Sequence, residues 1–158
     1  MRRLRSLFGS VRAEKAESTH QPAVGRLKAS DPELGALAEQ ADLDTLVQCG
    51  VFVCERAVEV TGFKGATGWP FDPHARLGPK EIARLKEIAD RFDAEYIRWH
   101  EAADPRADRP FSIARVAYAL LFAAEATHFS WREGIYEALM SLETADETRA
   151  ELIRQLRG

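Results

Sequence analysis

A regular seam of apolar residues is the feature of this sequence that most limits its fold. Between Ile82 and Ala103 the apolar residues follow one another at spacings of 3, 4, 3, 4, 3 and 4. They are Ile82, Leu85, Ala89, Phe92, Tyr96, Trp99 and Ala103. Residues at these spacings line one stripe of an α-helix. The seam therefore predicts a helix over 79–103, beginning at Pro79 and packed at a shallow angle in a helical bundle.

Four further helices are predicted from the same periodicity. Ser30-Asp31-Pro32-Glu33 has a capping residue and a first-turn proline, and it predicts a helix over about 30–41. The other three are expected from Asp42 or Asp44 to about Val58, over 112–142, and over 145–156. In the second helix, Gly50 indicates a close approach between two helices. With 158 residues, rich in good helix formers, the chain is predicted to be an all-α, compact bundle of four or five helices.

Charge divides the chain into a basic arm and an acidic body. Residues 1–28 carry a net charge of +5 and residues 29–158 one of −8. We therefore expect an N-terminal arm and linker over 1–29 and one helical domain over 30–158. Leu4, Leu7, Phe8 and Val11 predict an amphipathic helix within residues 2–15. Five interpretations of the arm stay open: docking on its own acidic body, disorder, attachment to a membrane surface, nucleic-acid binding, and binding to another protein.

A long aromatic loop is expected between the second and third helices. Residues 61–78 hold four glycines and two prolines, which disfavour regular structure. The loop carries Phe63, Trp69, Phe71 and His74, which are the candidate partner-binding residues. Exposed aromatic side chains held by prolines are typical of interface anchors. The alternative is that Trp69 and Phe71 fold back and cover the end of the bundle.

One pair of residues raises the alternative of a metal site. Glu125 and His128 are three residues apart, and on one helix they would share a face, as in carboxylate-bridged di-iron bundles. Glu95 or His100 from the third helix would complete the set, although a second Glu-x-x-His is absent. A structural ion pair of Glu125 is the simpler interpretation, and general acid–base chemistry is a third.

Other classes of function find little support in the sequence. The chain has no phosphate-binding glycine loop and no nucleophile motif, so no cofactor is expected and an enzyme is disfavoured. The acidic body disfavours nucleic-acid binding. Cys49 and Cys54 are expected to be buried, reduced thiols, which suits a bacterial cytoplasm. The leading hypothesis is a non-catalytic module, such as an adaptor, inhibitor or immunity-type protein, that binds another, basic protein.

Overall fold

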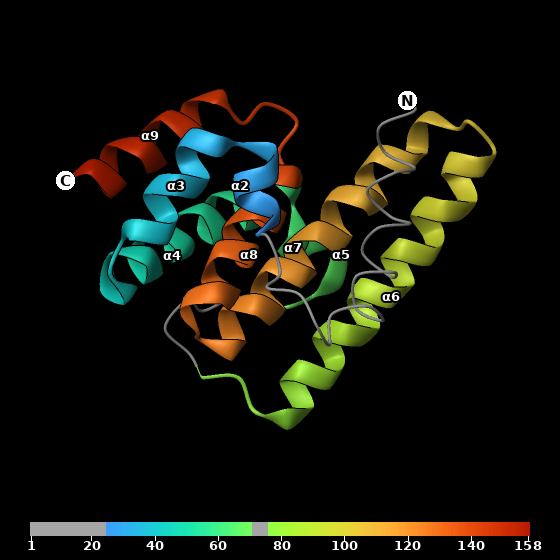
Figure 1. Cartoon of the computed structure of the whole chain (residues 1–158). Helices are drawn as coiled ribbons and strands as arrows, with labels where there is room; N and C mark the ends of the chain where they lie inside the picture. Colours follow the sequence, from blue (N-terminus) through green and yellow to red (C-terminus); the bar gives the residue numbers. More distant parts are fainter. Residues whose placement is uncertain (1–24, 71–75) are drawn as a thin grey trace, which may run out of the picture.

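The computed structural model describes residues 25–70 and 76–158, and this part of the chain is helical throughout (Figure 1). It contains no strand there, so the predicted all-α class is confirmed. The elements are α2 (Arg26–Ser30), α3 (Pro32–Gln40), α4 (Leu43–Thr61), α5 (Phe63–Thr67), α6 (Pro79–Glu101), a 3₁₀ turn η1 (Pro105–Ala107), α7 (Asp108–Glu125), α8 (His128–Met140) and α9 (Asp146–Arg157). The described residues thus form eight α-helices, more than the four or five predicted.

Several helix boundaries follow from local capping. Asp31 caps α3 by accepting a hydrogen bond from the Leu34 N–H, with Pro32 in the first turn. Ser30, which the sequence pattern favoured for this role, is the last residue of α2 instead. Asp42 caps α4 through the Thr45 N–H. These caps satisfy backbone donors that a helix start would otherwise leave unpaired.

The predicted single helix over 112–142 is wrong, because the chain breaks into α7 and α8. Ala126 adopts a left-handed conformation with φ of 55°, which ends α7. Thr127 and Ser130 then form a reciprocal capping box that starts α8. Gly134 lies where α8 meets α7, with the Ala119 carbonyl oxygen 3.3 Å from the position of an added Cβ.

Two predicted boundaries of the body also shift. The segment expected to be a structureless loop holds the last residue of α4 and the whole of α5 before its backbone becomes irregular at Gly68. At the start of the fold, Arg26–Ser30 already forms a helix, and Leu27 is buried in the core. The described fold therefore begins before residue 30, where the predicted domain began.

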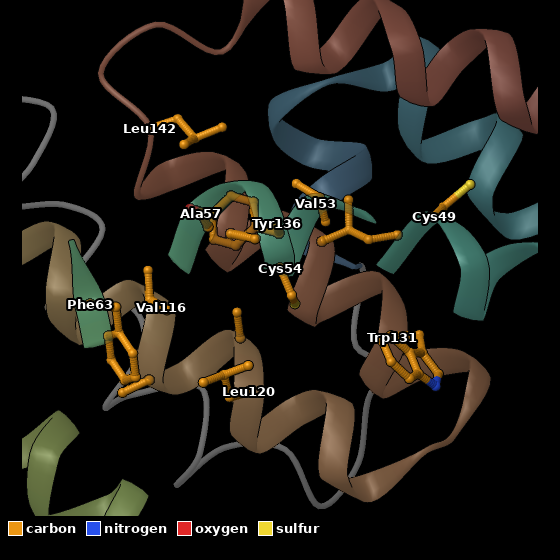
Figure 2. Packing of buried hydrophobic residues seen from close by; sticks show 14 of the residues in the cluster. Cys49, Val53, Cys54, Ala57, Phe63, Val116, Leu120, Trp131, Tyr136 and Leu142 are labelled. Carbon is orange, nitrogen blue, oxygen red and sulfur yellow. The ribbon is translucent and has the colours of Figure 1, made fainter. Parts of the chain in front are cut away.

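The core lies where α4, α7 and α8 pack together (Figure 2). Val53, Val116 and Ile135 are fully buried there, one from each helix. Both cysteines are free thiols within this core, as predicted. The predicted close approach at Gly50 is also confirmed, since the Trp131 ring lies against it.

Helix α6 lies along α7 and forms an antiparallel hairpin with it, joined by η1 (Figure 1). Its predicted apolar stripe is turned toward α7, with Leu85, Ala89 and Tyr96 buried. Helices α2, α3 and α4 lie beside α8 on the other side of the molecule, and α9 packs against α3 and α4. Within residues 25–70 and 76–158, no helix is both long enough and apolar enough to span a bilayer.

Candidate interaction surface

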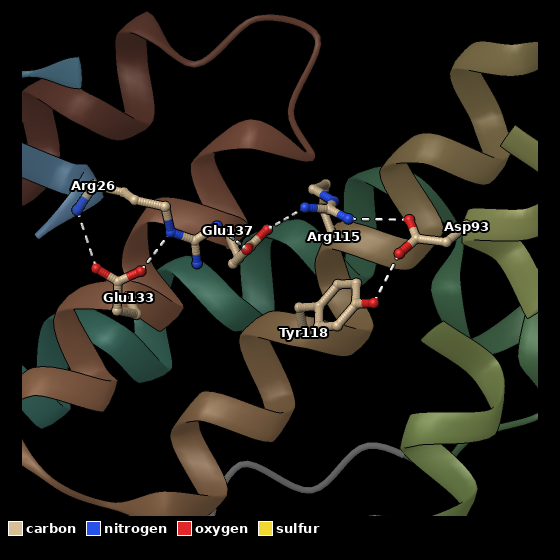
Figure 3. A network of polar contacts seen from close by, with 6 residues as sticks. All are labelled: Arg26, Asp93, Arg115, Tyr118, Glu133 and Glu137. Atoms are coloured by element: carbon tan, nitrogen blue, oxygen red, sulfur yellow. Dashed lines mark hydrogen bonds and ion pairs between the residues drawn. The ribbon is translucent and has the colours of Figure 1, made fainter. Parts of the chain in front are cut away.

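An ion-pair network runs from the first described helix to the hairpin (Figure 3). Arg26 of α2 binds two carboxylates of α8. Its Nε lies 2.6 Å from Oε2 of Glu133, and its backbone N–H donates to Oε1 of the same carboxylate over 3.1 Å. Its Nη1 lies 2.8 Å from Oε1 of Glu137. One arginine therefore fastens α2 to two successive turns of α8.

The network continues from α8 into both helices of the hairpin. Arg115 of α7 lies with Nη1 3.1 Å from Oε2 of Glu137 and with Nη2 3.0 Å from Oδ1 of Asp93 on α6. The Tyr118 hydroxyl donates a hydrogen bond of 2.7 Å to Oδ2 of Asp93. The chain of contacts thus joins α2, α8, α7 and α6.

All six carboxylate oxygens of Asp93, Glu133 and Glu137 contact a donor group. Each of these oxygens is therefore already engaged by a cation, an amide or a hydroxyl within the fold. Burial alone would lower the pKa of Arg26, but the nearby Glu137 and Glu133 carboxylates outweigh it and raise that pKa. The network is thus a charged, structural tie that fixes how the hairpin sits on α8.

The open side of α7 carries a stripe of aromatic residues. Phe111, Tyr118 and Phe122 are half-buried and lie on one face of the helix, at positions i, i+7 and i+11. Arg115 occupies the turn between the first two, and its guanidinium carbon lies 5.4 Å and 4.8 Å from their ring centroids. Arg26 lies over the third ring at 5.8 Å. The cations thus hold the rings in place by cation–π contacts.

A stripe of α6 lies beside these aromatics. Asp93 reaches Tyr118 through its hydrogen bond, and Tyr96 lies 5.2 Å from the Phe111 ring. One and two turns after Asp93 come Ile97, which is 41% exposed, and the half-buried His100, which stacks on Tyr96. We call the combined surface the hairpin face, and define it by Asp93, Ile97, His100, Phe111, Tyr118 and Phe122.

Two exposed carboxylates, Asp90 and Asp108, lie near the tyrosines of the hairpin. Burial is the largest cause of a raised pKa at Tyr96, Tyr118 and Tyr136, and nearby carboxylates raise it further. The charged groups that act on these three hydroxyls are five carboxylates and two guanidinium groups, namely Asp90, Asp93, Asp108, Glu133, Glu137, Arg26 and Arg115. Asp93, Glu133 and Glu137 are paired with Arg26 and Arg115, so Asp90 and Asp108 are the carboxylates of this set that stay exposed beside the aromatic rings.

The structure separates the residues of the predicted metal site. Glu125 is exposed at the end of α7 and His128 begins α8, so the expected shared helical face is wrong. The His128 Nε2 lies 2.9 Å from the Ala41 carbonyl oxygen. Glu95 accepts a hydrogen bond from the Trp99 indole, and His100 lies near the start of α7, about 20 Å of helix from Glu125. No group of three or more potential ligands occurs within the described ranges.

The predicted partner-binding residues divide into two groups. Phe63 is fully buried and Trp69 is only 4% exposed, and both belong to the core cluster. Arg84 lies over the Trp69 ring at 5.4 Å. Their placement agrees with the alternative interpretation, in which the loop folds back onto the bundle. Phe71 and His74 lie outside the described residues.

The network was not predicted from the sequence, although α8 carries a signal of it. Glu133 and Glu137 are one turn apart in a helix whose neighbouring residues Trp131, Ile135 and Tyr136 are apolar. Carboxylates on an apolar helix face need buried partners. Arg115 gives a similar signal, because buried apolar residues flank it on α7. Which cation meets which carboxylate depends on the tertiary fold.

Comparison with protein-family models, characterised proteins and solved structures finds no match to this chain.

Proposed function

We propose that this chain is a non-catalytic protein–protein interaction module that binds a basic, amphipathic segment of another protein along the hairpin face. The observation that carries the proposal is the coincidence of the half-buried aromatic stripe with the exposed carboxylates Asp90 and Asp108. A helix or strand with alternating apolar and cationic side chains matches this surface in both respects.

Pre-organisation supports the same conclusion. Arg115 fixes Phe111 and Tyr118 from between them, and Asp93 holds the Tyr118 hydroxyl. Rings that are already fixed lose little side-chain entropy when a partner covers them. Large aromatic side chains are also the residues that most often dominate binding energy at interfaces.

The charge of residues 25–158 favours a basic partner. Residues 1–24 hold five of the 22 basic residues and two of the 25 acidic ones, which leaves 17 basic and 23 acidic residues after Val24. A net charge of −6 attracts cationic surfaces and speeds their encounter at low ionic strength. We therefore expect partner binding to weaken as salt is added.

The proposal is tested with a probe of defined chemistry. The full-length chain is titrated against a fluorescent 14-residue helical peptide of leucine and lysine, and against the same peptide with glutamate in place of lysine. We expect binding of the lysine peptide alone. Ile97→Lys places a cation on the hairpin face and should weaken that binding about tenfold, or about 1.4 kcal/mol.

Val60→Lys is the matched control. Val60 is 54% exposed on α4, so this variant makes the same change in net charge away from the hairpin face. It should bind the lysine peptide as the wild type does. If Ile97→Lys and Val60→Lys lost binding equally, the peptide would be held by general charge attraction, which would contradict the proposed site.

A further inference from the structure

We infer that the chain's own basic arm, residues 2–15, binds the hairpin face in the free protein and competes with the partner. The inference rests on the proposed function, because it assigns a regulator to the same surface. Its first support is the place where the chain enters the described fold.

Arg26 marks that entry point. Its backbone N–H and guanidinium both bind Glu133, and the guanidinium lies 4.7 Å from the Tyr136 ring centroid and 5.8 Å from that of Phe122. The residue before it, Gly25, is buried. The arm therefore joins the fold beside Phe122, at one end of the aromatic stripe.

The length of the arm fits the length of the stripe. Phe111 and Phe122 are eleven residues apart on α7, which is about 16 Å along the helix axis. A helix over residues 2–15 would be about 21 Å long. The nine residues between them and Gly25 span at most about 30 Å when extended, which is enough for the arm to turn back along α7.

The chemistry of the arm complements the hairpin face. Leu4, Leu7, Phe8 and Val11 form an apolar stripe, and residues 1–24 carry five basic and two acidic side chains. A helix this short is marginal in water and needs a surface that buries its apolar side. The hairpin face offers aromatic rings for that stripe, and the exposed carboxylates Asp90 and Asp108 beside it can pair with the arginines.

Covalent attachment strengthens such a contact. A short covalent tether gives an effective concentration in the millimolar range, so an arm with weak intrinsic affinity still occupies the surface for most of the time. A partner must then displace the arm. The apparent affinity of the partner is therefore its intrinsic affinity multiplied by the fraction of molecules in which the hairpin face is free. The arm would thus set a threshold for partner binding.

Paramagnetic relaxation in the full chain tests the contact directly. Ser10→Cys allows a nitroxide label on the arm, while Cys49 and Cys54 are buried. We expect strong broadening of the amide signals of Ile97, Tyr118 and their neighbours, with α9 unaffected. Asp90→Lys, on the exposed side of α6 near Tyr118, should reduce that broadening severalfold.

Glu59→Lys is the control for this variant, because Glu59 is exposed on α4 and the change in charge is the same. It should keep the broadening. Broadening confined to α9 or α4, no broadening at all, or a labelled arm that binds anionic vesicles and leaves the hairpin signals sharp would overturn the inference.

A competition experiment separates this inference from the proposed function. Replacing Arg2, Arg3 and Arg5 by glutamine in the full chain should release the hairpin face and tighten binding of the lysine peptide about tenfold. If both chains bind the peptide equally, the arm does not compete, and the proposed function stands alone. If neither binds it while the label still broadens the hairpin signals, the arm contact stands and the proposed partner chemistry fails.

Discussion

The indole ring of Trp131 lies directly against Gly50, so that a Cβ at position 50 would come within 2.2 Å of its Cε3 atom. Gly50 is buried in α4, and Trp131 is buried in the first turn of α8. The missing side chain allows these two helices to pack closely. This contact thereby fixes the position of α8 on the core. Helix α8 carries Glu133 and Glu137 of the ion-pair network.

Gly50→Ala should therefore destabilise the fold. The new methyl group must displace a large buried ring, and overpacking of this kind costs about 1–3 kcal/mol. In an exposed helix the same substitution would be favourable, because alanine is the better helix former. Urea unfolding followed by circular dichroism measures the difference, with the slope of the transition expected to stay constant.

Gly65→Ala is the control for this variant. Gly65 lies within α5, and nothing comes within 4 Å of an added Cβ there. This change should leave stability the same or raise it by up to about 1 kcal/mol. If Gly50→Ala unfolded at the same urea midpoint as the wild type, Trp131 would be shown to move aside at little cost in free energy.

Periodicity and turn chemistry predict the long helices of this fold well. The seam predicted α6 almost to its ends, and Gly50 predicted the close approach of α4 to another helix. The break at Thr127 was missed because Ala126 has high helix propensity and the apolar pattern continues across it. Only the capping pair Thr127 and Ser130 gave a local signal. Their capping hydrogen bonds outweigh the helix propensity of Ala126.

The candidate site was harder to predict, for a physical reason. Arg26 and Glu133 are 107 positions apart, and Arg115 and Glu137 are 22 apart, so their pairing depends on how the helices pack. The short-range pattern Glu125-x-x-His128 instead raised the alternative of a metal site. The aromatic stripe of α7 was not predicted, because periodicity alone does not show which side of an apolar helix stays open.

Glu137→Gln should weaken the fold strongly. Its carboxylate lies between the guanidinium groups of Arg26 and Arg115, and its side chain is only 2% exposed. The amide keeps the shape but leaves two buried cations with less compensation, which costs about 3–5 kcal/mol where a buried pair is broken. Chemical unfolding measures the loss, and added salt should change it little.

Glu143→Gln makes the same chemical change at an exposed position after α8. It should alter stability by less than about 0.5 kcal/mol. If Glu137→Gln were equally mild, the network would contribute little, and the orientation of the hairpin would depend on apolar packing alone.

The ion pair between Asp31 and Arg149 should make stability depend on pH. The hydrogen bond from Arg149 lowers the pKa of Asp31, and the bond from the Leu34 N–H lowers it further. The folded pKa thus lies below the unfolded value of about 3.9. The stabilisation is fully present above that value and is lost as the pH falls through the folded pKa. Asp31→Asn should therefore lower the urea midpoint at pH 7, and this difference should shrink as the pH falls below about 3.9.

Asparagine caps a helix about as well as aspartate, so this variant isolates the charge from the cap. Arg149→Gln removes the other partner and should show the same dependence on pH. The double variant should lose less than the sum of the two single losses, since both remove one interaction. Strict additivity at pH 7 would contradict the pairing.

The two cysteines should be inert toward thiol reagents in the folded protein. Burial raises the pKa of Cys54 to about 12, and burial likewise raises the pKa of Cys49. At pH 8 the thiolate fraction of Cys54 is then about three orders of magnitude lower than that of a free cysteine. Maleimide labelling followed by mass spectrometry should show no modification in native buffer and two modifications in concentrated guanidinium chloride. A cysteine introduced at exposed Glu143 should react at once under both conditions, whereas rapid native labelling of Cys49 would show that α4 opens locally away from α9.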